Sequence, residues 1–128
     1  INLFLKKRDY LAKKYRKFFL PLKEKRILNY FNSPKNQISS NHLFILNIEF
    51  KKIKKNKDKF FKFMLKNKIM CQFHYIPIYR FNKFKRLSRK LTNTEKYYYN
   101  SVSLPIHFNL TAKQQNKVVR CIYKFLTK

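Results

Sequence analysis

The sequence contains no glycine and no tryptophan, and five of its 128 residues are acidic. Without glycine, a glycine-rich phosphate-binding loop cannot form, and turns must rely on Asn, Asp, Ser and Pro. We therefore expect Asn to occupy the backbone positions with left-handed geometry. So few carboxylates also argue against the paired acids of a glycosidase.

Cysteine is scarce, and long apolar runs are missing. Cys71 and Cys121 cannot make a disulfide framework, so we expect reduced thiols and a cytoplasmic protein. No apolar run approaches the roughly 18 residues of a membrane span, and Lys6, Lys7 and Arg8 interrupt any signal-peptide core. A hydrophobic fraction of 45% nevertheless predicts one folded domain rather than a disordered chain.

The formal net charge is +27. Such a charge favours nucleic acid, because neutralising phosphates releases counterions. The alternative is compositional drift, since the enriched residues Lys, Asn, Ile, Phe and Tyr have codons rich in A and T. One continuous basic face lined by aromatics would favour nucleic acid, whereas basic residues on the outer face of every helix would favour drift. We favour drift, because the densest block, residues 51–57, is interrupted by Ile53.

Periodicity predicts three elements in the first half of the chain. Apolar residues recur at helical spacing over residues 3–20, and Pro21 is expected to end that helix. Residues 42–50 alternate between apolar and other side chains, as in a strand with one buried face. Asp58 is expected to cap a second helix that ends near Asn67.

The second half predicts a strand over residues 69–75, an irregular stretch, and two helices with capping boxes. Thr92 with Glu95 would open the first of these helices, and Thr111 with Gln114 would open the last. Between them, residues 103–108 contain Pro105, which predicts an edge strand or a loop. In the strand at 69–75, one face is expected to carry Ile69, Cys71, Phe73 and Tyr75, and the other Met70, Gln72 and His74.

This order of elements predicts an α/β two-layer sandwich, with a small, mainly antiparallel sheet and helices on one face. The chain starts with Ile1 inside a predicted helix, so we expect it to be part of a longer protein.

Four segments carry a more specific signal. Residues 71–79 (Cys-Gln-Phe-His-Tyr-Ile-Pro-Ile-Tyr) resemble the His-Tyr-x-Pro-x-(Tyr/His) signature of DegT-type nucleotide-sugar aminotransferases. Residues 103–107 (Ser-Leu-Pro-Ile-His) resemble that family's Ser-Leu-Pro segment, and residues 42–44 (His-Leu-Phe) resemble the start of its small-domain strand. Residues 6–15 are similar to the helix that links the family's two domains. The matches occur in the family's order and cover most of the chain.

The resemblance implies a fold-type-I aminotransferase in which pyridoxal phosphate is bound by a large domain outside these residues. Residues 1–33 would be the interdomain helix and connection, and residues 34–128 the C-terminal small domain. In the family, glutamate supplies the amino group and a nucleotide-linked keto sugar receives it. Gln72 before Phe73 is most similar to members that aminate a UDP-linked 4-keto sugar on the way to pseudaminic acid. A homodimer is implied, and the 128 residues alone are expected to be inactive.

The resemblance also implies a substrate-binding role for part of this chain. Gln72 and His74 would project together toward a sugar or phosphate, and Arg80 would hold a diphosphate. Pro77 would fix the chain as it leaves the strand, and Tyr75 and Tyr79 would offer phenol groups or a stacking surface. The predicted substrate-binding set is Gln72, His74, Tyr75, Ile76, Pro77, Tyr79 and Arg80.

Less specific interpretations stand beside these assignments. His42 and His107 are expected to be structural, and Tyr97, Tyr98 and Tyr99 to lie in the core and at its rim. A zinc site at Cys71 and His74 is not expected, because the two face opposite sides of a strand and no second ligand pair is near. Lys68 stands where the family usually has glycine, which puts the geometry of that corner in doubt.

Two other hypotheses remain open for the chain as a whole. One is a stand-alone basic module that binds single-stranded nucleic acid, with no binding to a membrane. The other is an inert fragment of a longer gene product.

Overall fold

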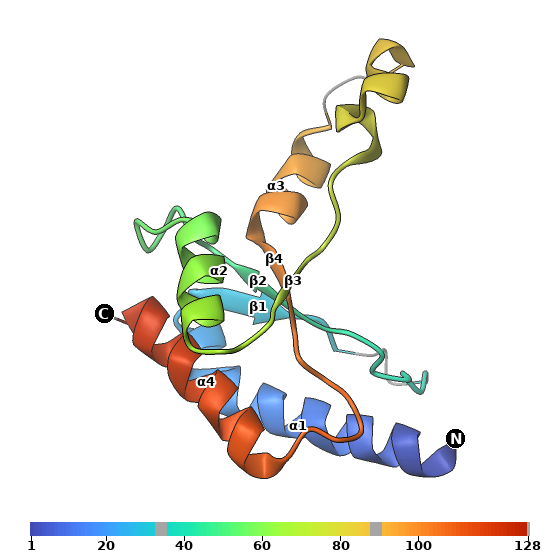
Figure 1. Ribbon diagram of the computed structural model, residues 1–128, viewed down its shortest axis with the longest axis vertical. Coiled ribbons are helices and arrows are strands. Elements are labelled where there is room, and N and C mark those ends of the chain that lie inside the picture. The colour runs from blue at the N-terminus through green and yellow to red at the C-terminus, as the bar shows by residue number, and fades with distance from the viewer. Residues whose placement is uncertain (33–35, 88–90, 128) are drawn as a thin grey trace.

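The computed structural model describes residues 1–32, 36–87 and 91–127. These residues form an α/β fold in which a four-stranded antiparallel sheet packs against helices, as the sequence predicts (Figure 1). In chain order the elements are α1 (Asn2–Glu24), β1 (Leu28–Tyr30), β2 (Phe44–Ile48), α2 (Lys57–Lys66), β3 (Gln72–Phe73), η1 (Ile78–Arg80), η2 (Asn82–Leu87), α3 (Thr92–Asn100), β4 (Ser101–Leu104) and α4 (Ala112–Thr127). Of the helices described, none is both long enough and apolar enough to cross a membrane.

The sheet order is β1-β2-β4-β3, so β4 lies in the interior of the sheet. The prediction of an edge strand or loop at residues 103–108 is therefore wrong. The strand starts earlier, at Ser101, and ends at Leu104, so Pro105 follows it and removes no hydrogen bond from the ladder. The carbonyl oxygen of Pro105 instead accepts a hydrogen bond of 2.9 Å from the Tyr15 hydroxyl.

One face of the sheet carries the hydrophobic core. The alternation predicted for β2 is confirmed, because Phe44, Leu46 and Ile48 are all buried. Helix α1 packs on this face through Tyr15, whose ring centroid lies 4.9 Å from that of Phe44. Figure 1 shows α1 and α4 side by side beneath the sheet, and α2 contacts α4 as well. Burial of these apolar side chains stabilises the fold.

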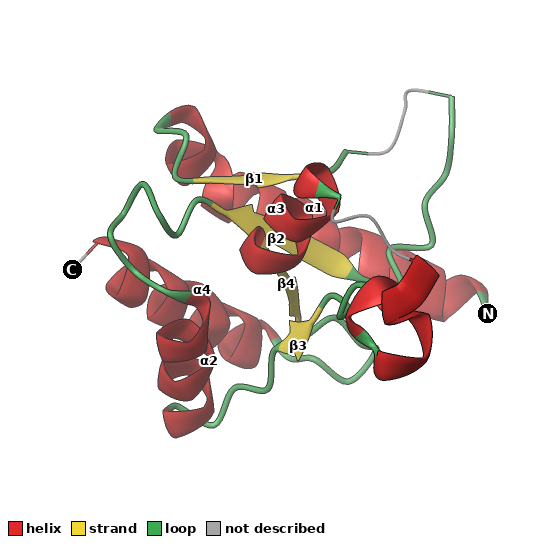
Figure 2. Cartoon of the chain, turned by 90° about the horizontal axis from the view of Figure 1, so that it is seen from above, coloured by secondary structure: helices red, strands yellow, loops and turns green. Residues whose placement is uncertain are grey.

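A projecting arm, defined here as the described residues 76–87 and 91–100, leaves the other side of the sheet. It contains η1, η2 and α3, and it extends away from α1 and α4 in Figure 1. Figure 2, seen from above, places α3 over β2, with which it is in contact. The arm is therefore joined to the body through β3, β4 and the foot of α3, where Asn100 and Ser101 are buried.

Two predicted helix ends are wrong. Helix α1 continues past Pro21 to Glu24, because the buried side chain of Leu22 packs into the core and offsets the hydrogen bond that proline cannot donate. Helix α2 is capped by Asn56 rather than Asp58: the Asn56 side chain accepts a hydrogen bond of 2.8 Å from the Lys59 amide. Asp58 lies in the first turn, where its charge favours the positive end of the helix dipole.

The two predicted capping boxes have different outcomes. Thr111 and Gln114 form one, because the Gln114 amide donates to the Thr111 hydroxyl (3.2 Å) and the Thr111 amide donates to Gln114 Oε1 (2.9 Å). Thr92 and Glu95 do not, since α3 has no side-chain cap and the Glu95 carboxylate accepts hydrogen bonds from Tyr79 and Arg80 instead. The sequence signature alone did not show that Glu95 had a competing partner.

Left-handed backbone positions are also distributed differently from the prediction. Asn41 has a φ of 44°, as expected for asparagine, but positive φ also occurs at Arg26, Lys54 and Lys68. The expectation that Asn would take these positions is wrong for the three basic residues. Each accepts a cost of about 1 kcal/mol relative to an ordinary φ. Lys68, with a φ of 58°, takes the corner directly where the family usually has glycine.

Candidate functional site

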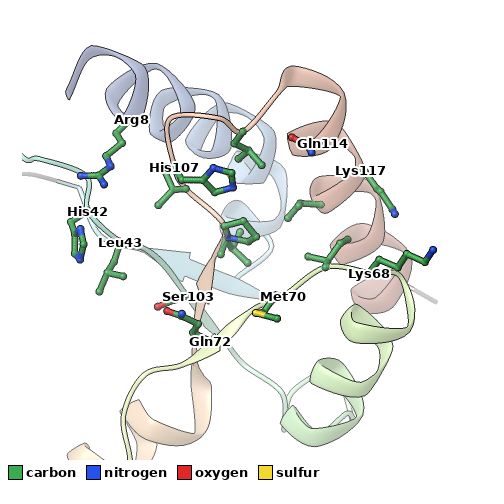
Figure 3. A pocket seen from close by; sticks show the side chains of 16 residues that line it. Arg8, His42, Leu43, Lys68, Met70, Gln72, Ser103, His107, Gln114 and Lys117 are labelled. Atoms are coloured by element: carbon green, nitrogen blue, oxygen red, sulfur yellow. The ribbon is translucent and has the colours of Figure 1, made fainter. Parts of the chain in front are cut away.

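A cavity of about 710 Å³ lies where α1, β4 and α4 meet the start of β2 and β3 (Figure 3). Its lining includes Arg8, His42, Gln72, Ser103 and His107. These residues come from the four segments that resemble the aminotransferase family, although those segments are up to about a hundred positions apart in the sequence. The fold therefore brings part of each segment to one cavity. From residues 71–79, and from the predicted substrate-binding set, Gln72 alone lines it among the described residues.

Gln72 and His74 share a face of the chain, as predicted. Gln72 is paired with Ser103 in the β3–β4 register, and His74 Nδ1 lies 3.5 Å from the Ser103 hydroxyl oxygen. Burial and the positive charge of Lys57 lower the pKa of His74 below its ordinary value. His74 is therefore neutral at pH 7 and contributes a hydrogen-bonding nitrogen rather than a charge.

The residues that follow do not all lie as predicted. The Phe73 ring stacks on Phe61 with a centroid distance of 3.9 Å but is 46% exposed, and Tyr75, expected on the same buried face, is 73% exposed. The expected burial of this face is therefore wrong for both residues. The strand β3 ends at Phe73, so alternation stops before Tyr75 is reached. Ile76 is exposed as well, whereas Pro77 is buried and holds the turn into the arm.

Tyr79 and Arg80 converge on Glu95 of α3. The Tyr79 hydroxyl and Arg80 Nε each lie 3.0 Å from Glu95 Oε1, and Arg80 also pairs with Glu95 Oε2. Arg80 Nη2 donates to the Tyr99 hydroxyl at 2.9 Å. Hydrogen bonds to Glu95 and then Tyr99 raise the pKa of Arg80. The predicted site residues thus fall into two groups, one at Ser103 and one at Glu95.

Lys57 lies between these groups, and the sequence analysis placed it in a basic loop. It is 8% exposed, donates to the Tyr98 carbonyl oxygen, and lies 4.5 Å from the Tyr98 ring and 5.0 Å from the Phe73 ring. Burial lowers the pKa of Lys57 to about 8, against a smaller opposing effect of Asp58. Its position gives the base of the arm a buried cation held by aromatic rings.

Sequence reasoning missed Arg8, Lys57 and the cavity role of His42 and His107. The two histidines belong to the segments that carried the resemblance, and that signal could have found them. Arg8 also lies in one of these segments, residues 6–15, but basic residues occur throughout the chain, so nothing in the sequence set Arg8 or Lys57 apart. The Tyr97–Tyr99 expectation holds in part, since Tyr97 and Tyr98 are half-buried and Tyr99 is 53% exposed.

The chain matches known proteins over almost its whole length. The model of the DegT/DnrJ/EryC1/StrS aminotransferase family matches residues 1–123. A UDP-4-amino-4,6-dideoxy-N-acetyl-beta-L-altrosamine transaminase of Helicobacter pylori is 30% identical over 88 residues, which are 67% of this chain and 23% of that protein.

Solved structures agree. The H. pylori PseC aminotransferase involved in the biosynthesis of pseudaminic acid superposes with a TM-score of 0.84 at 25% identity, over 97% of this chain and 33% of that one. The aminotransferase TlmJ of Streptoalloteichus hindustanus gives 0.83 at 17% identity, over 97% and 32%, which is a likeness of fold. The chain thus spans a quarter to a third of the length of these relatives. With the family model matched from the first helix into the last, this chain belongs to the DegT/DnrJ/EryC1/StrS aminotransferase family.

Proposed function

We propose that this chain is the C-terminal part of a sugar aminotransferase that transfers an amino group from glutamate to a UDP-linked 4-keto sugar. Residues 1–33 would be the interdomain helix and connection, and residues 34–128 the small domain. The complete enzyme would act in the cytoplasm as a homodimer, in pseudaminic acid biosynthesis. The activity and pathway of the H. pylori relatives support this choice of substrate class and pathway.

The observation that carries the proposal is the convergence of four family-like segments on one cavity. Gln72 and Ser103 offer an amide and a hydroxyl there, and His74 adds a neutral imidazole next to Ser103. These groups bind and orient a polar ligand without donating charge to it. Pro77, which is buried, fixes the direction in which the chain leaves this group.

Pyridoxal phosphate does not fit the residues of this chain. A bound cofactor needs a lysine free to form an imine and an acidic partner for the pyridine nitrogen. Lys68 and Lys117 line the cavity, but among the described residues no acidic residue does, so the partner for the pyridine nitrogen is missing. The cofactor, which supplies the electron sink for amino transfer, would be bound by another part of the enzyme. The 128 residues alone would therefore be inactive.

The nucleic-acid hypothesis receives no support from the distribution of charge. Exposed basic side chains lie on every α-helix, for example Lys13 on α1, Lys59 on α2, Lys96 on α3 and Lys113 on α4. This scatter is the pattern expected of compositional drift. Nonspecific binding of nucleic acid at low salt is expected of any chain with a net charge of +27.

Sequencing the DNA upstream of the codon for Ile1, and expressing any longer reading frame, tests the proposal. With pyridoxal phosphate, L-glutamate and the UDP-linked 4-keto sugar, we expect the longer protein to produce 2-oxoglutarate and an amino sugar, detected by mass spectrometry. The 128-residue chain under the same conditions is the control and should produce neither. A stop codon directly before a start at Ile1, or a longer protein without this activity, would count against the proposal.

A further inference from the structure

Arg8 stands out among the cations that line the cavity, because its Nε is buried without an acceptor. No hydrogen bond or ion pair joins its side chain to another described residue. Figure 3 shows its side chain beside His42 at the edge of the cavity. A buried guanidinium nitrogen without an acceptor is costly, and that cost is removed when an anion binds.

The cavity has positive charge and no acid to neutralise it. Lys68 and Lys117 line it together with Arg8, and none of its lining residues is Asp or Glu. Lysine and arginine are no more frequent here than elsewhere in the chain. A second pocket, lined by Arg16, also lacks carboxylates in its described lining, but Arg16 donates to Asn41. What distinguishes the present site is an arginine whose side chain has no partner among the described residues.

The acidic residue beside Arg8 in the sequence is already engaged. Asp9 pairs with Lys13 at 2.7 Å, and its other carboxylate oxygen accepts a long hydrogen bond of 3.5 Å from Asn41. Across the molecule, Glu95 is taken by Arg80. Within the described part of the chain, no carboxylate forms an ion pair with Arg8.

Neutral hydrogen-bonding groups complete the lining. Gln72 and Ser103 lie side by side across the β3–β4 register. Gln114 uses its Oε1 to accept from Thr111, which leaves its amide nitrogen as a donor. The lining thus offers the guanidinium group of Arg8 on one side, and the two ammonium groups and the Gln114 amide on the opposite side, with Gln72 and Ser103 between them (Figure 3).

We propose that this cavity is an anion-binding site in which Arg8 is the principal charged contact, and that its ligand is either a diphosphate or an amino-acid carboxylate. Both present several negatively charged oxygens at the spacing that a guanidinium fork recognises. The inference rests on the proposed function, whose two substrates carry these anions, and deepens it by assigning the anion contact to Arg8. It also moves the main anion contact from Arg80, where the resemblance put it, to Arg8.

Isothermal titration of the 128-residue chain with pyrophosphate, UDP and L-glutamate, at about 0.15 M salt to screen surface charge, tests the site. Arg8→Gln removes the cation, and Arg120→Gln is the matched control, because Arg120 is exposed on α4 and does not line the cavity. We expect Arg8→Gln to weaken binding about tenfold or more, and Arg120→Gln to change it less than about twofold. Arg8→Lys should give an intermediate value, since it keeps the charge and loses the fork.

The three ligands distinguish the two sources of anion. Binding of pyrophosphate and UDP without glutamate assigns the site to a nucleotide diphosphate, and the reverse assigns it to the amino-acid substrate; either outcome supports the proposal. Equal losses in Arg8→Gln and Arg120→Gln, or no saturable binding of any of the three, would overturn it. So would a chain without a cooperative thermal transition, because the cavity exists only when α1 packs against α4 and β4.

Discussion

Arg8 and Arg80 are the same kind of residue in opposite situations. Arg80, on the arm, pairs with Glu95, donates to Tyr99, and lies 4.9 Å from the Tyr98 ring. Arg8, on the body, lines a cavity and has no partner among the described residues. In the arm, one of the five acidic residues of the chain, Glu95, pairs with Arg80, which we call the closed site. At the cavity, which we call the open site, no described acidic residue pairs with Arg8. The difference indicates that the arm's arginine holds structure and the body's arginine is available to a ligand.

Lys57 shows a third way to hold a cation. Its ammonium group is enclosed by the Phe73 and Tyr98 rings and bonded to a backbone carbonyl oxygen, without a carboxylate contact. In a chain with few acids, aromatic rings and carbonyl oxygens take over the role of counter-charge. Lys55 is held in the same manner, by the carbonyl oxygen and ring of Phe125 at the end of α4. Arg8 has a partly buried side chain without a carboxylate, ring or carbonyl partner among the described residues, and this marks it as a candidate for binding an external anion.

The largest effect is expected from Glu95→Gln, which breaks the closed site. It removes the carboxylate that binds Tyr79 and Arg80, and so loosens η1 from α3 within the arm. We expect cleavage by trypsin within residues 76–100 to accelerate about tenfold or more, because local opening becomes more frequent. Limited proteolysis followed by mass spectrometry measures this rate. Glu24→Gln, at an exposed residue, is the control, and equal rates in both variants would show that the pair does not hold the arm.

Tyr15→Phe tests the hydrogen bond that joins α1 to the lining of the cavity. The Tyr15 hydroxyl ties α1 to Pro105, which lines the cavity, and burial raises the pKa of this phenol, so it remains a donor at alkaline pH. Loss of this hydrogen bond should lower the free energy of unfolding by about 1–2 kcal/mol. Urea denaturation measures the change. Tyr10→Phe, at a half-exposed residue on the same helix, should leave the free energy of unfolding nearly unchanged.

Much of the fold could be predicted from the sequence, because its core elements are strongly periodic. The alternation in β2 and the capping box at Thr111 and Gln114 are local signals, and both are confirmed. The errors at Pro21 and at β4 have a different origin. Whether a proline ends a helix depends on how the next residues, here Leu22, pack into the core. Whether four residues form an interior strand depends on pairing with distant segments, here β2 and β3.

The site could be predicted less well than the fold. Motifs placed Gln72 and His74 near each other, and Ser103 joins them in the structure. The choice of Arg80 as the free cation used nearness in sequence, and it could not include Glu95, fifteen residues later. Arg8 could not be singled out at all, since what marks it is the absence of a partner. That property exists only in three dimensions.

A smaller effect is expected from the pH dependence of Lys57. Burial lowers the pKa of Lys57 to about 8 in the folded chain, while an unfolded lysine titrates near pH 10.4. Between about pH 8 and 10 the unfolded chain therefore binds the extra proton, so this group's contribution to the free energy of unfolding rises with pH. Relative to Lys57→Met, the free energy of unfolding of the original chain should rise by about 1 kcal/mol between pH 8 and pH 10.

Urea denaturation at pH 8 and pH 10 measures this difference, because it cancels the titration of the other lysines. Lys59→Met, at an exposed residue of the same helix, is the matched control and should show no trend. If the difference in free energy of unfolding between the original chain and Lys57→Met stays constant or falls with pH, burial does not destabilise the Lys57 ammonium group. Lys57 would then not be a cation enclosed by the protein, as Arg80 is.

The smallest effect is expected from Asp9→Asn. This substitution tests whether Asp9, the acidic residue next to Arg8 in the sequence, neutralises the charge of Arg8. Asp9 pairs with Lys13 across one turn of α1, and both side chains are largely exposed. Such a pair contributes less than about 0.5 kcal/mol to the free energy of unfolding. If Asp9 does not neutralise Arg8, the dissociation constant for pyrophosphate should change less than about twofold, and toward tighter binding. A much larger decrease in the dissociation constant would show that Asp9 partly neutralises Arg8. Arg8 and Arg80 would then both be influenced by a carboxylate, and would differ only in how strongly.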